Sequence, residues 1–236
     1  MNNGIEYKKV VITGGIKRIG LAIAEGFFSA GYNLKLHYNS SSEDTLRDSS
    51  AISAEMIQCD FAVAERDDLK KLVEGCDILI NNASVYWTEK NPIKISDYEV
   101  IQKKINYDVP VRLMDLFAEE NVNRHALIIN ILDSLALCNS NSDSYSNSKY
   151  MLAQATKEYA VKLAPNIRVN GIAPGPVLPP EWAPDSVMEK SVSNMLLNYP
   201  PLSSDIASAC VFLAETKSIT GEIIRIDSGF SLNTSP

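Results

Sequence analysis

The sequence predicts an α/β fold built on a doubly wound parallel sheet. Short apolar runs alternate with longer amphipathic stretches along all 236 residues, and a glycine-rich turn follows the first apolar run. Alternating strands and helices imply right-handed crossovers and a parallel sheet with helices on both faces. Because no linker or internal repeat divides the chain, we expect one domain over residues 1–236.

Each element is predicted from its own residues. Gly31 is placed to end the first helix, and Ser96 is placed to cap a later one through a capping box completed by Glu99. Apolar runs rich in Val, Ile and Leu predict strands at residues 8–13, 32–38, 54–58, 77–81, 125–132, 166–172 and 222–227. Amphipathic stretches predict helices at residues 18–30, 42–51, 65–74, 97–122, 145–163, 184–197 and 204–215.

Composition restricts the partners that the chain is expected to have. The net charge of −7 argues against nucleic acid or an anionic membrane surface as the main partner. No apolar run is long enough for a membrane helix, and the N-terminus lacks the layout of a secretory signal, so we expect a cytoplasmic protein. The four cysteines and two histidines are scattered without metal-ligand spacing, which predicts reduced thiols and no metal.

Residues 13–20 read Thr-Gly-Gly-Ile-Lys-Arg-Ile-Gly and directly follow the apolar run Val10-Val11-Ile12. Glycines let the backbone approach a phosphate, and a helix N-terminus presents unpaired N–H groups and a partial positive charge. Arg18 stands where the nearest loop pattern has another glycine, so it adds a fixed cation beside the bound group. The loop predicts a site for a dinucleotide.

The end of the second strand indicates which dinucleotide binds. A domain that binds NAD usually offers an acidic residue there, about 20 residues after the loop, for the ribose hydroxyl. The chain offers amides and hydroxyls instead, and its nearest acids, Glu43 and Asp44, come later. Together with Arg18 these groups favour a 2′-phosphate, and so NADP(H). The predicted cofactor-binding residues are Gly14, Lys17, Arg18, Ile19, His37, Tyr38, Asn39, Ser40, Asp60, Phe61, Asn82, Ala83, Ser84, Tyr145, Lys149, Pro174 and Gly175.

Tyr145 is the predicted acid, and Lys149 is the neighbouring cation predicted to lower its pKa. A spacing of four places both side chains on one helix face, and an ammonium near a phenol favours the phenolate, so the pKa of Tyr145 is expected to fall. Such a tyrosine gives or takes a proton. The alternative is a surface tyrosine beside a lysine, which the glycine loop makes the weaker interpretation.

Other polar or aromatic residues have two interpretations each. Asp133, with Ser134, ends a buried strand and faces the binding crevice, or it caps the following turn. Asn106 has a backbone carbonyl that Pro110 leaves unpaired and able to hold a water, or the proline simply kinks the helix. Tyr86 and Trp87 stack on a flat ring or pack their loop on the core. Asp60 accepts from adenine or caps a helix.

Taken together, these motifs resemble the short-chain dehydrogenase/reductase family over nearly the whole chain. The matching residues include the glycine loop, Asn81-Asn82-Ala83, Asn106, Tyr145 with Lys149, and Pro174-Gly175. The resemblance implies a Rossmann fold with seven strands, Tyr145 as proton donor, and Lys149 on the nicotinamide ribose. It also implies Asn106 in a proton relay, a substrate loop around residues 174–200, and a homotetramer or homodimer.

Within the family the chain is most similar to pteridine and dihydromonapterin reductases. Lys17-Arg18, His37-Tyr38, Ser84 and Asp133 carry this similarity. It implies NADPH-dependent hydride transfer to a C=N bond of a dihydropterin, with catalytic residues Tyr145, Lys149, Asp133 and Asn106. The implied substrate contacts are Arg18, Ser84, Tyr86, Asp133 and Tyr145.

Two departures from this pattern leave alternatives open. The run from Asp133 to Tyr145 is one residue shorter than in those relatives, so Ser134 can be the functional residue, as in a reductase of 3-oxoacyl thioesters or sugars. A basic residue for the 2′-phosphate is replaced by Asn39 and Ser40. A third alternative is an NADP(H)-binding sensor without catalysis.

Overall fold

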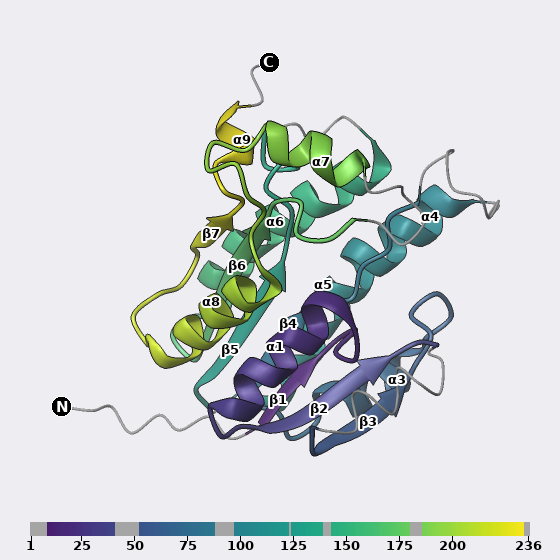
Figure 1. The fold of residues 1–236 in the computed structure, drawn as a ribbon. Coiled ribbons are helices and arrows are strands. Elements are labelled where there is room, and N and C mark those ends of the chain that lie inside the picture. Colours follow the sequence, from purple (N-terminus) through teal and green to yellow (C-terminus); the bar gives the residue numbers. More distant parts are fainter. Residues whose placement is uncertain are drawn as a thin grey trace.

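The structure is a computed structural model that describes residues 9–40, 52–87, 97–122, 124–138, 143–179 and 186–233. One parallel sheet of seven strands crosses the molecule in the order β3-β2-β1-β4-β5-β6-β7 (Figure 1). The predicted fold class and all seven predicted strands are confirmed. The strands are β1 (Lys9–Ile12), β2 (Asn33–Tyr38), β3 (Ala54–Gln58), β4 (Ile78–Asn81), β5 (Ala126–Ile131), β6 (Ile167–Pro174) and β7 (Ile223–Ile226).

Helices cover both faces of this sheet. The short α9 was not predicted, and the predicted helix at residues 42–51 lies outside the described residues. Within the described ranges, no helix combines the length and apolarity needed to cross a lipid bilayer. The helices are α1 (Arg18–Ser29), α3 (Arg66–Val73), α4 (Tyr98–Lys103), the π-helix η1 (Lys104–Asp108), α5 (Val109–Glu120), α6 (Ser144–Lys162), α7 (Ser186–Ser193), α8 (Ser203–Glu215) and α9 (Phe230–Asn233).

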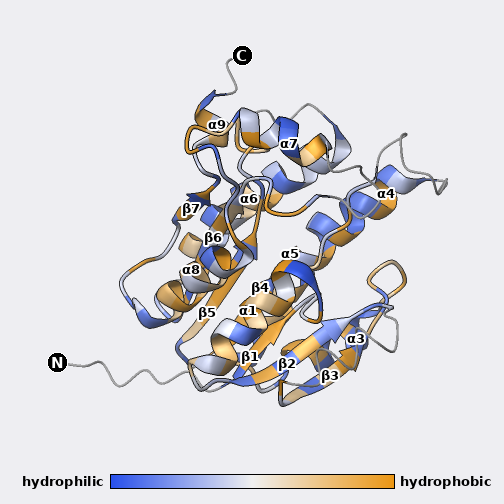
Figure 2. Ribbon diagram, in the orientation of Figure 1, coloured by the Kyte–Doolittle hydropathy of each residue, from blue (hydrophilic) through white to orange (hydrophobic). Residues whose placement is uncertain are grey.

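Alternate residues of the inner strands point into two separate apolar layers. Val10 and Ile12 of β1 pack with α1 and α8, whereas Val11 packs with α3, α5 and α6. The inner strands are therefore apolar on both faces, as Figure 2 shows for β1, β4 and β5. The strand order reverses between β1 and β4, and in such sheets this switch point is where ligands bind.

The end of α1 follows from its glycine, as predicted. Gly31 has a φ of 86° and donates its N–H to Phe28 O, while Tyr32 N–H reaches back to Phe27 O. The rings of Phe27 and Tyr32 pack edge to face at 5.1 Å. Paired bonds of this kind with an apolar contact are a Schellman motif, which ends a helix at glycine.

The long helix predicted at residues 97–122 is interrupted, and its predicted cap was wrong. The helix begins at Tyr98 with Asp97 at the N-cap, which has a φ of 56° and makes no side-chain cap bond, and Ser96 lies outside the described residues. After α4 the chain forms the π-helix η1 and restarts as α5, with Pro110 in the first turn. Proline lacks an N–H and crowds the preceding turn, so a wider turn just before it relieves the clash.

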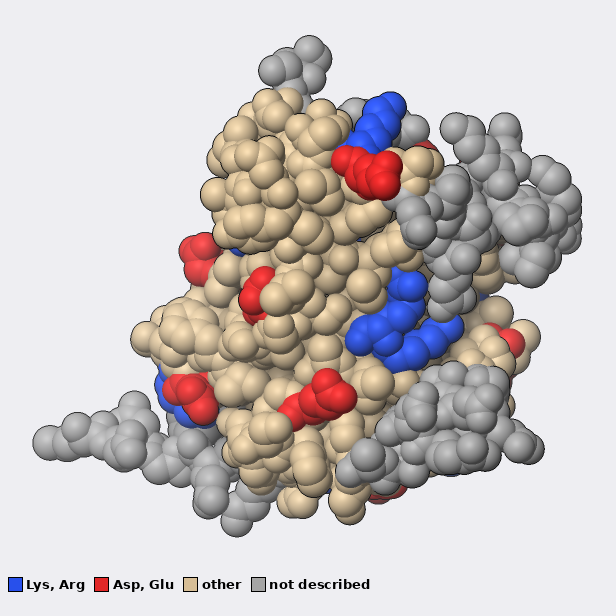
Figure 3. Space-filling view, in the orientation of Figure 1, with Lys and Arg blue, Asp and Glu red and all other residues tan. Residues whose placement is uncertain are grey.

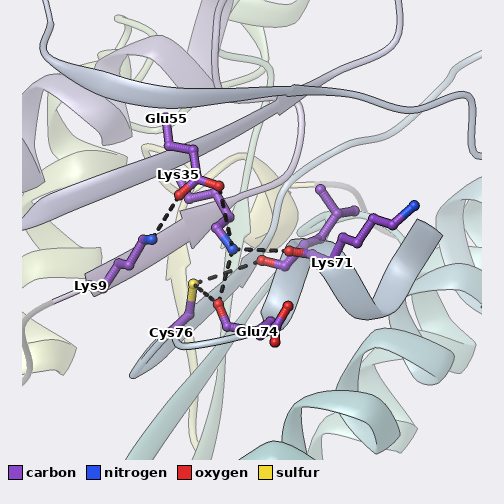
Figure 4. Close-up of polar contacts among 7 residues, drawn as sticks. Lys9, Lys35, Glu55, Lys71, Glu74 and Cys76 are labelled. Carbon is purple, nitrogen blue, oxygen red and sulfur yellow. Dashed lines mark hydrogen bonds and ion pairs between the residues drawn. The ribbon is translucent and has the colours of Figure 1, made fainter. Parts of the chain in front are cut away.

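A buried lysine ties the β2 edge of the sheet to α3. Lys35 of β2 is 3 % exposed and donates from Nζ to the carbonyl oxygens of Lys71 and Glu74, at 2.9 and 3.0 Å (Figure 4). Its ammonium also lies 3.8 Å from Glu55 Oε1, and Glu55 pairs with Lys9 at 2.7 Å. A cation at the C-terminal end of a helix satisfies carbonyls that have no helical partner.

We expect Lys35→Met to lower the free energy of unfolding by about 2–3 kcal/mol, because it removes a charged donor from two part-buried carbonyl oxygens at a helix end. Lys9→Met is the matched control, since it removes only the exposed pair with the same Glu55 and is expected to cost less than ~1 kcal/mol. Urea unfolding of both variants measures the difference. Equal losses in the two variants contradict the capping role of Lys35.

Candidate active site

The glycine loop is locked to the end of β4. Thr13 Oγ accepts hydrogen bonds from the N–H groups of Asn82 and Ala83, both at 2.9 Å. Asn82 Nδ2 in turn donates to the carbonyls of Thr13 and Gly14. The two loops that flank the switch point therefore form one rigid unit.

Close approach explains two glycines of this loop. Gly14 has a φ of 62°, and a Cβ there would lie 3.1 Å from Ala83 Cα. A Cβ on Gly20 would overlap the carbonyl oxygen of Gly14 and lie 2.7 Å from Asn82 Nδ2. Side chains at these two positions would collide with neighbouring protein atoms, so glycine is required for the loop to pack against the end of β4.

Arg18 adopts the backbone conformation of the glycine that it replaces. Its φ is 54°, in the left-handed region that costs an ordinary residue roughly 1–2 kcal/mol. Its guanidinium donates to the carbonyl of Pro179 at 2.8 Å and approaches that of Leu178 at 3.4 Å. The side chain thus reaches from the glycine loop to the segment after β6, and joins the predicted phosphate site to the predicted substrate loop.

A pocket of about 400 Å³ lies at the switch point. Figure 3 shows a basic patch at the start of α1, where the pocket is lined by Lys17 and Arg18. Four other lining residues were not predicted from the sequence: Ile16, Gly20, Val85 and Ile105. Of these, only Gly20 is recognisable in the sequence, as the last glycine of the loop. The predicted cofactor residues that line the pocket are Gly14, Lys17, Arg18, Ile19, His37, Tyr38, Asn39, Ser40, Phe61, Asn82, Ala83 and Ser84.

The other predicted cofactor residues lie outside this lining. Asp60 Oδ1 accepts from Ala62 N at 2.8 Å, so its carboxylate caps a turn and not the helix that the competing interpretation proposed. Gly175 is tightly packed, because a Cβ there would lie 2.7 Å from Asp227 Cβ. Pro174 ends β6, next to Gly175. In the described residues, no group of His, Cys, Asp or Glu side chains is arranged to hold a metal ion.

His37 supports the glycine loop through a hydrogen bond with its backbone. Its Nδ1 accepts from Gly14 N at 3.1 Å, so Nε2 carries the hydrogen and donates to Cys59 O at 2.8 Å. The ring stacks on Phe61 at 4.0 Å and is 2 % exposed. Burial lowers the pKa of His37 to about 4. Both nitrogens serve the backbone, so the geometry makes His37 a support for the loop.

The lowered pKa of His37 predicts a loss of stability in mild acid. Because the folded pKa of about 4 lies below the ordinary value of 6.5, the unfolded chain binds the proton more readily. The stabilising contribution is complete above pH 6.5 and is lost as the pH falls towards 4, by roughly 3 kcal/mol in total. Denaturant titrations from pH 7 to pH 4 measure the free energy of unfolding.

We expect His37→Asn to remove this part of the pH dependence. His125→Asn is the control, because His125 is the other histidine of the chain and is exposed. Identical pH profiles for the wild-type chain and His37→Asn contradict the prediction.

The structure brings Tyr145 and Lys149 together on α6, but the expected fall in the pKa of Tyr145 was wrong. Burial raises the pKa of Tyr145 well above its ordinary value, and the charge of Asp133 adds to the rise, although a hydrogen bond from Ser84 opposes it. Lys149 Nζ donates to Ile131 O at 2.9 Å and lies 5.9 Å from the centroid of the Tyr145 ring. Burial lowers the pKa of Lys149 to about 8. Loss of hydration thus outweighs the effect of the ammonium on the phenol.

Asp133 carries a charge that acts on this pair. Burial raises the pKa of Asp133, and its charge acts on the pKa values of Tyr145 and Lys149. Its Oδ1 accepts from the N–H groups of Leu135 and Ala136, at 2.8 and 3.0 Å, so the residue also caps the turn. Ser134 is fully buried and lies by Asp227. Although burial raises the pKa of Asp227, hydrogen bonds from Ser231, Gly229 and Ser134 hold it below its ordinary value.

Asn106 uses its side chain to hold the segment after β4. This fully buried residue of η1 accepts at Oδ1 from Ser84 Oγ at 3.1 Å and from Val85 N at 2.9 Å, and its Nδ2 donates to Val85 O. The interruption of the helix agrees with the kink interpretation. The water held by the Asn106 carbonyl stays a prediction.

The aromatic residues of the same segment have different surroundings. Tyr86 is 40 % exposed, and its ring packs edge to face on Tyr145 with centroids 5.0 Å apart. Trp87 packs against the apolar layer that contains α5 and α6, as the alternative interpretation proposed. Tyr86 is thus the aromatic that borders Tyr145.

Comparison with known proteins identifies the family. The family model described as enoyl-(acyl carrier protein) reductase matches residues 15–231. The chain belongs to the short-chain dehydrogenase/reductase family. The resemblance read from the glycine loop, Tyr145 and Lys149 is therefore confirmed, together with the expectation of a short-chain reductase.

Similar proteins within this family include a dihydromonapterin reductase and two proteins named alternative dihydrofolate reductase. The dihydromonapterin reductase of Enterobacter sp. (strain 638) is 28 % identical, over 96 % of this chain and 98 % of that protein. The crystal structure of FolM alternative dihydrofolate reductase 1 from Brucella suis, in complex with NADP, is 31 % identical with a TM-score of 0.85, and 95 % of each chain is covered. The protein of that name from Brucella canis, complexed with NADP, is 30 % identical with a TM-score of 0.82, over 95 % of this chain and 94 % of that one.

Proposed function

We propose that the chain is an NADPH-dependent reductase that transfers hydride to a C=N bond of a dihydropterin. One observation carries the proposal: the charge of Asp133 acts on the pair Tyr145 and Lys149, while the aromatic Tyr86 borders the same tyrosine. A carboxylate accepts hydrogen bonds from the amino and ring N–H groups of a pterin, and an aromatic face stacks on its flat ring. Relatives named dihydromonapterin reductase support the same substrate class.

The pocket fits NADP(H) better than NAD(H). Lys17 and Arg18 supply positive charge at its mouth, and the end of β2 lines it with Tyr38, Asn39 and Ser40 instead of an acid. Gly14 and Gly20 line the pocket, where the loop backbone and the start of α1 can contact phosphates. Two structural neighbours carry NADP, which supports this choice.

In the mechanism NADPH supplies the hydride, and the chain supplies position and a proton. The raised pKa of Tyr145 keeps its phenol protonated at neutral pH, so the proton is present for donation. Lys149 is held against Ile131 O beside the phenol, where its charge favours the tyrosinate formed on donation. Asn106 accepts the hydrogen bond of the Ser84 hydroxyl and so fixes Ser84 beside Tyr145, where Ser84 lowers the pKa of the phenol. Arg18 is proposed to hold phosphate and the edge of the pterin.

Steady-state kinetics test the proposal. We expect purified protein to oxidise NADPH several-fold faster when dihydromonapterin or dihydrobiopterin is added, with NADH a poorer donor. Absence of any acceleration by either dihydropterin would contradict the proposed substrate class. Binding of NADPH without turnover of any substrate would instead indicate the sensor that the sequence left open.

Paired substitutions decide between the pterin and the carbonyl substrate. We expect Asp133→Asn to lower kcat/KM about a hundredfold, since the variant keeps the turn cap but loses the charge beside Tyr145 and Lys149. Ser134→Ala is expected to stay within about threefold of the wild-type value, because it removes a hydroxyl that lies by Asp227. The reverse order of effects favours a carbonyl reductase in which Ser134 polarises the C=O.

We also propose the domain organisation, the assembly and the location of the chain. The chain forms one NADP(H)-binding domain over residues 1–236, with a substrate loop at about residues 174–200. It assembles as a homotetramer or homodimer. It works in the cytoplasm. Light scattering of the purified protein tests the assembly.

A further inference from the structure

The polar residue Gln102 occupies the buried position of an exposed helix. Among the six residues of α4, all of them described, only Gln102 is buried, and it has no solvent exposure. A helix that covers a core normally buries apolar residues, and a buried carboxamide is costly unless both of its ends are hydrogen-bonded. The place of Gln102 therefore calls for a reason in its contacts.

Both ends of the Gln102 carboxamide bind segments that border the proton donor. Oε1 accepts from the backbone N–H of Trp87 at 2.7 Å, and Nε2 donates to Ser144 Oγ at 2.7 Å. Trp87 follows Tyr86, and Ser144 precedes Tyr145 as the first residue of α6. One side chain thus joins the two chain segments whose tyrosine rings meet at 5.0 Å.

A second carboxamide holds the same segment close by. Asn106, four residues further along, bonds to Ser84 Oγ and to both backbone groups of Val85. Gln102 and Asn106 therefore hold the segment on either side of Tyr86. Only Gln102 extends the connection to α6, because its other end reaches Ser144.

We propose that Gln102 is a positioning residue that fixes the distance between Tyr86 and Tyr145, and with it the gap in which the substrate ring meets the proton donor. Reaction rates are sensitive to such placement, since a shift of about 1 Å can cost a hundredfold in rate. Gln102 itself need not touch the substrate. The inference rests on the proposed role of Tyr145 as proton donor, but not on the identity of the substrate.

Three variants isolate the connection. Gln102→Met removes both hydrogen bonds while keeping a similar volume, and Ser144→Ala removes only the bond to α6. Ser144→Thr keeps the hydroxyl and serves as the conservative rescue. Gln154→Met makes the same change as the first variant at an exposed position of α6, and is the matched control.

Two measurements test the proposal, one of them without any substrate. We expect kcat, on the substrate that the wild-type chain reduces, to fall about tenfold or more in Gln102→Met and about three- to tenfold in Ser144→Ala. The Kd for NADPH should stay within about twofold in every variant, because the glycine loop is untouched, and Ser144→Thr and Gln154→Met should retain kcat. Hydrogen exchange of the Trp87 amide should speed up at least about tenfold in Gln102→Met only.

The outcomes that overturn the proposal are specific. If Ser144→Ala keeps kcat within twofold of Gln154→Met, the connection does not position the donor, and this variant decides even where Gln102→Met fails to fold. If the Kd for NADPH weakens in proportion to kcat, the effect is a general loss of structure. Failure of the proposed function has a different signature, namely full activity in Tyr145→Phe.

Discussion

Replacing Tyr145 by phenylalanine is expected to lower kcat about a thousandfold while the Kd for NADPH changes less than about twofold. A positioned general acid typically contributes 10²–10⁴-fold to a rate, and the structure offers this phenol with its proton retained by a raised pKa. The ring of phenylalanine fills the same space against Tyr86, so the packing of the site is kept. Stopped-flow measurement of a single turnover isolates the chemical step from product release.

Tyr150→Phe is the matched control for this prediction, because it removes a hydroxyl from the same helix five residues further along. It is expected to keep the wild-type kcat. A rate for Tyr145→Phe within threefold of this control would remove Tyr145 from the mechanism. A proton source other than Tyr145 would then be required.

Replacing Gly20 by alanine is expected to weaken NADPH binding at least about tenfold and to lower the free energy of unfolding by ~1–3 kcal/mol. The new methyl group would overlap the carbonyl of Gly14 and press on the side chain of Asn82, and both belong to the rigid unit that flanks the switch point. Overpacking of this size shifts backbone rather than a flexible side chain. Fluorescence titration with NADPH and urea unfolding give the two quantities.

Gly31→Ala separates the two effects. Gly31 has a φ of 86° and open space where a Cβ would stand, so alanine strains the backbone by roughly 1–2 kcal/mol without touching the pocket. We expect a similar loss of stability in this variant and an unchanged Kd for NADPH. If both alanine variants bind NADPH equally well, the close approach at Gly20 does not shape the pocket.

Local patterns made most of the fold predictable. The runs of β-branched and aliphatic residues placed all seven strands to within two residues, and Gly31 ended α1 as expected. The errors lie where the signal is weak or irregular: α9 is only four residues long, and the start of α4 depends on a left-handed Asp97. Pro110 indicated an interruption, but a sequence does not distinguish a kink from the π-turn that forms there.

The candidate site was also predicted only in part from the sequence. The spacing of Tyr145 and Lys149 placed both on one helix, and the glycine loop placed the pocket. The direction of the tyrosine pKa was wrong, because the sequence shows the neighbouring charge but not the burial that outweighs it. Gln102 went unnoticed, since a glutamine on an amphipathic helix gives no sign of which face it occupies.

The sequence by itself determined the order of strands and helices, the phosphate-binding loop and the family, because these depend on short runs of neighbouring residues. Only the tertiary structure decided that burial raises the pKa of Tyr145, that His37 supports the loop, and that Gln102 joins Trp87 to Ser144. The physical reason is that desolvation and hydrogen bonding depend on which groups meet in space. The partners of Gln102 lie 15 and 42 residues away along the chain, a relation that only the packed fold creates.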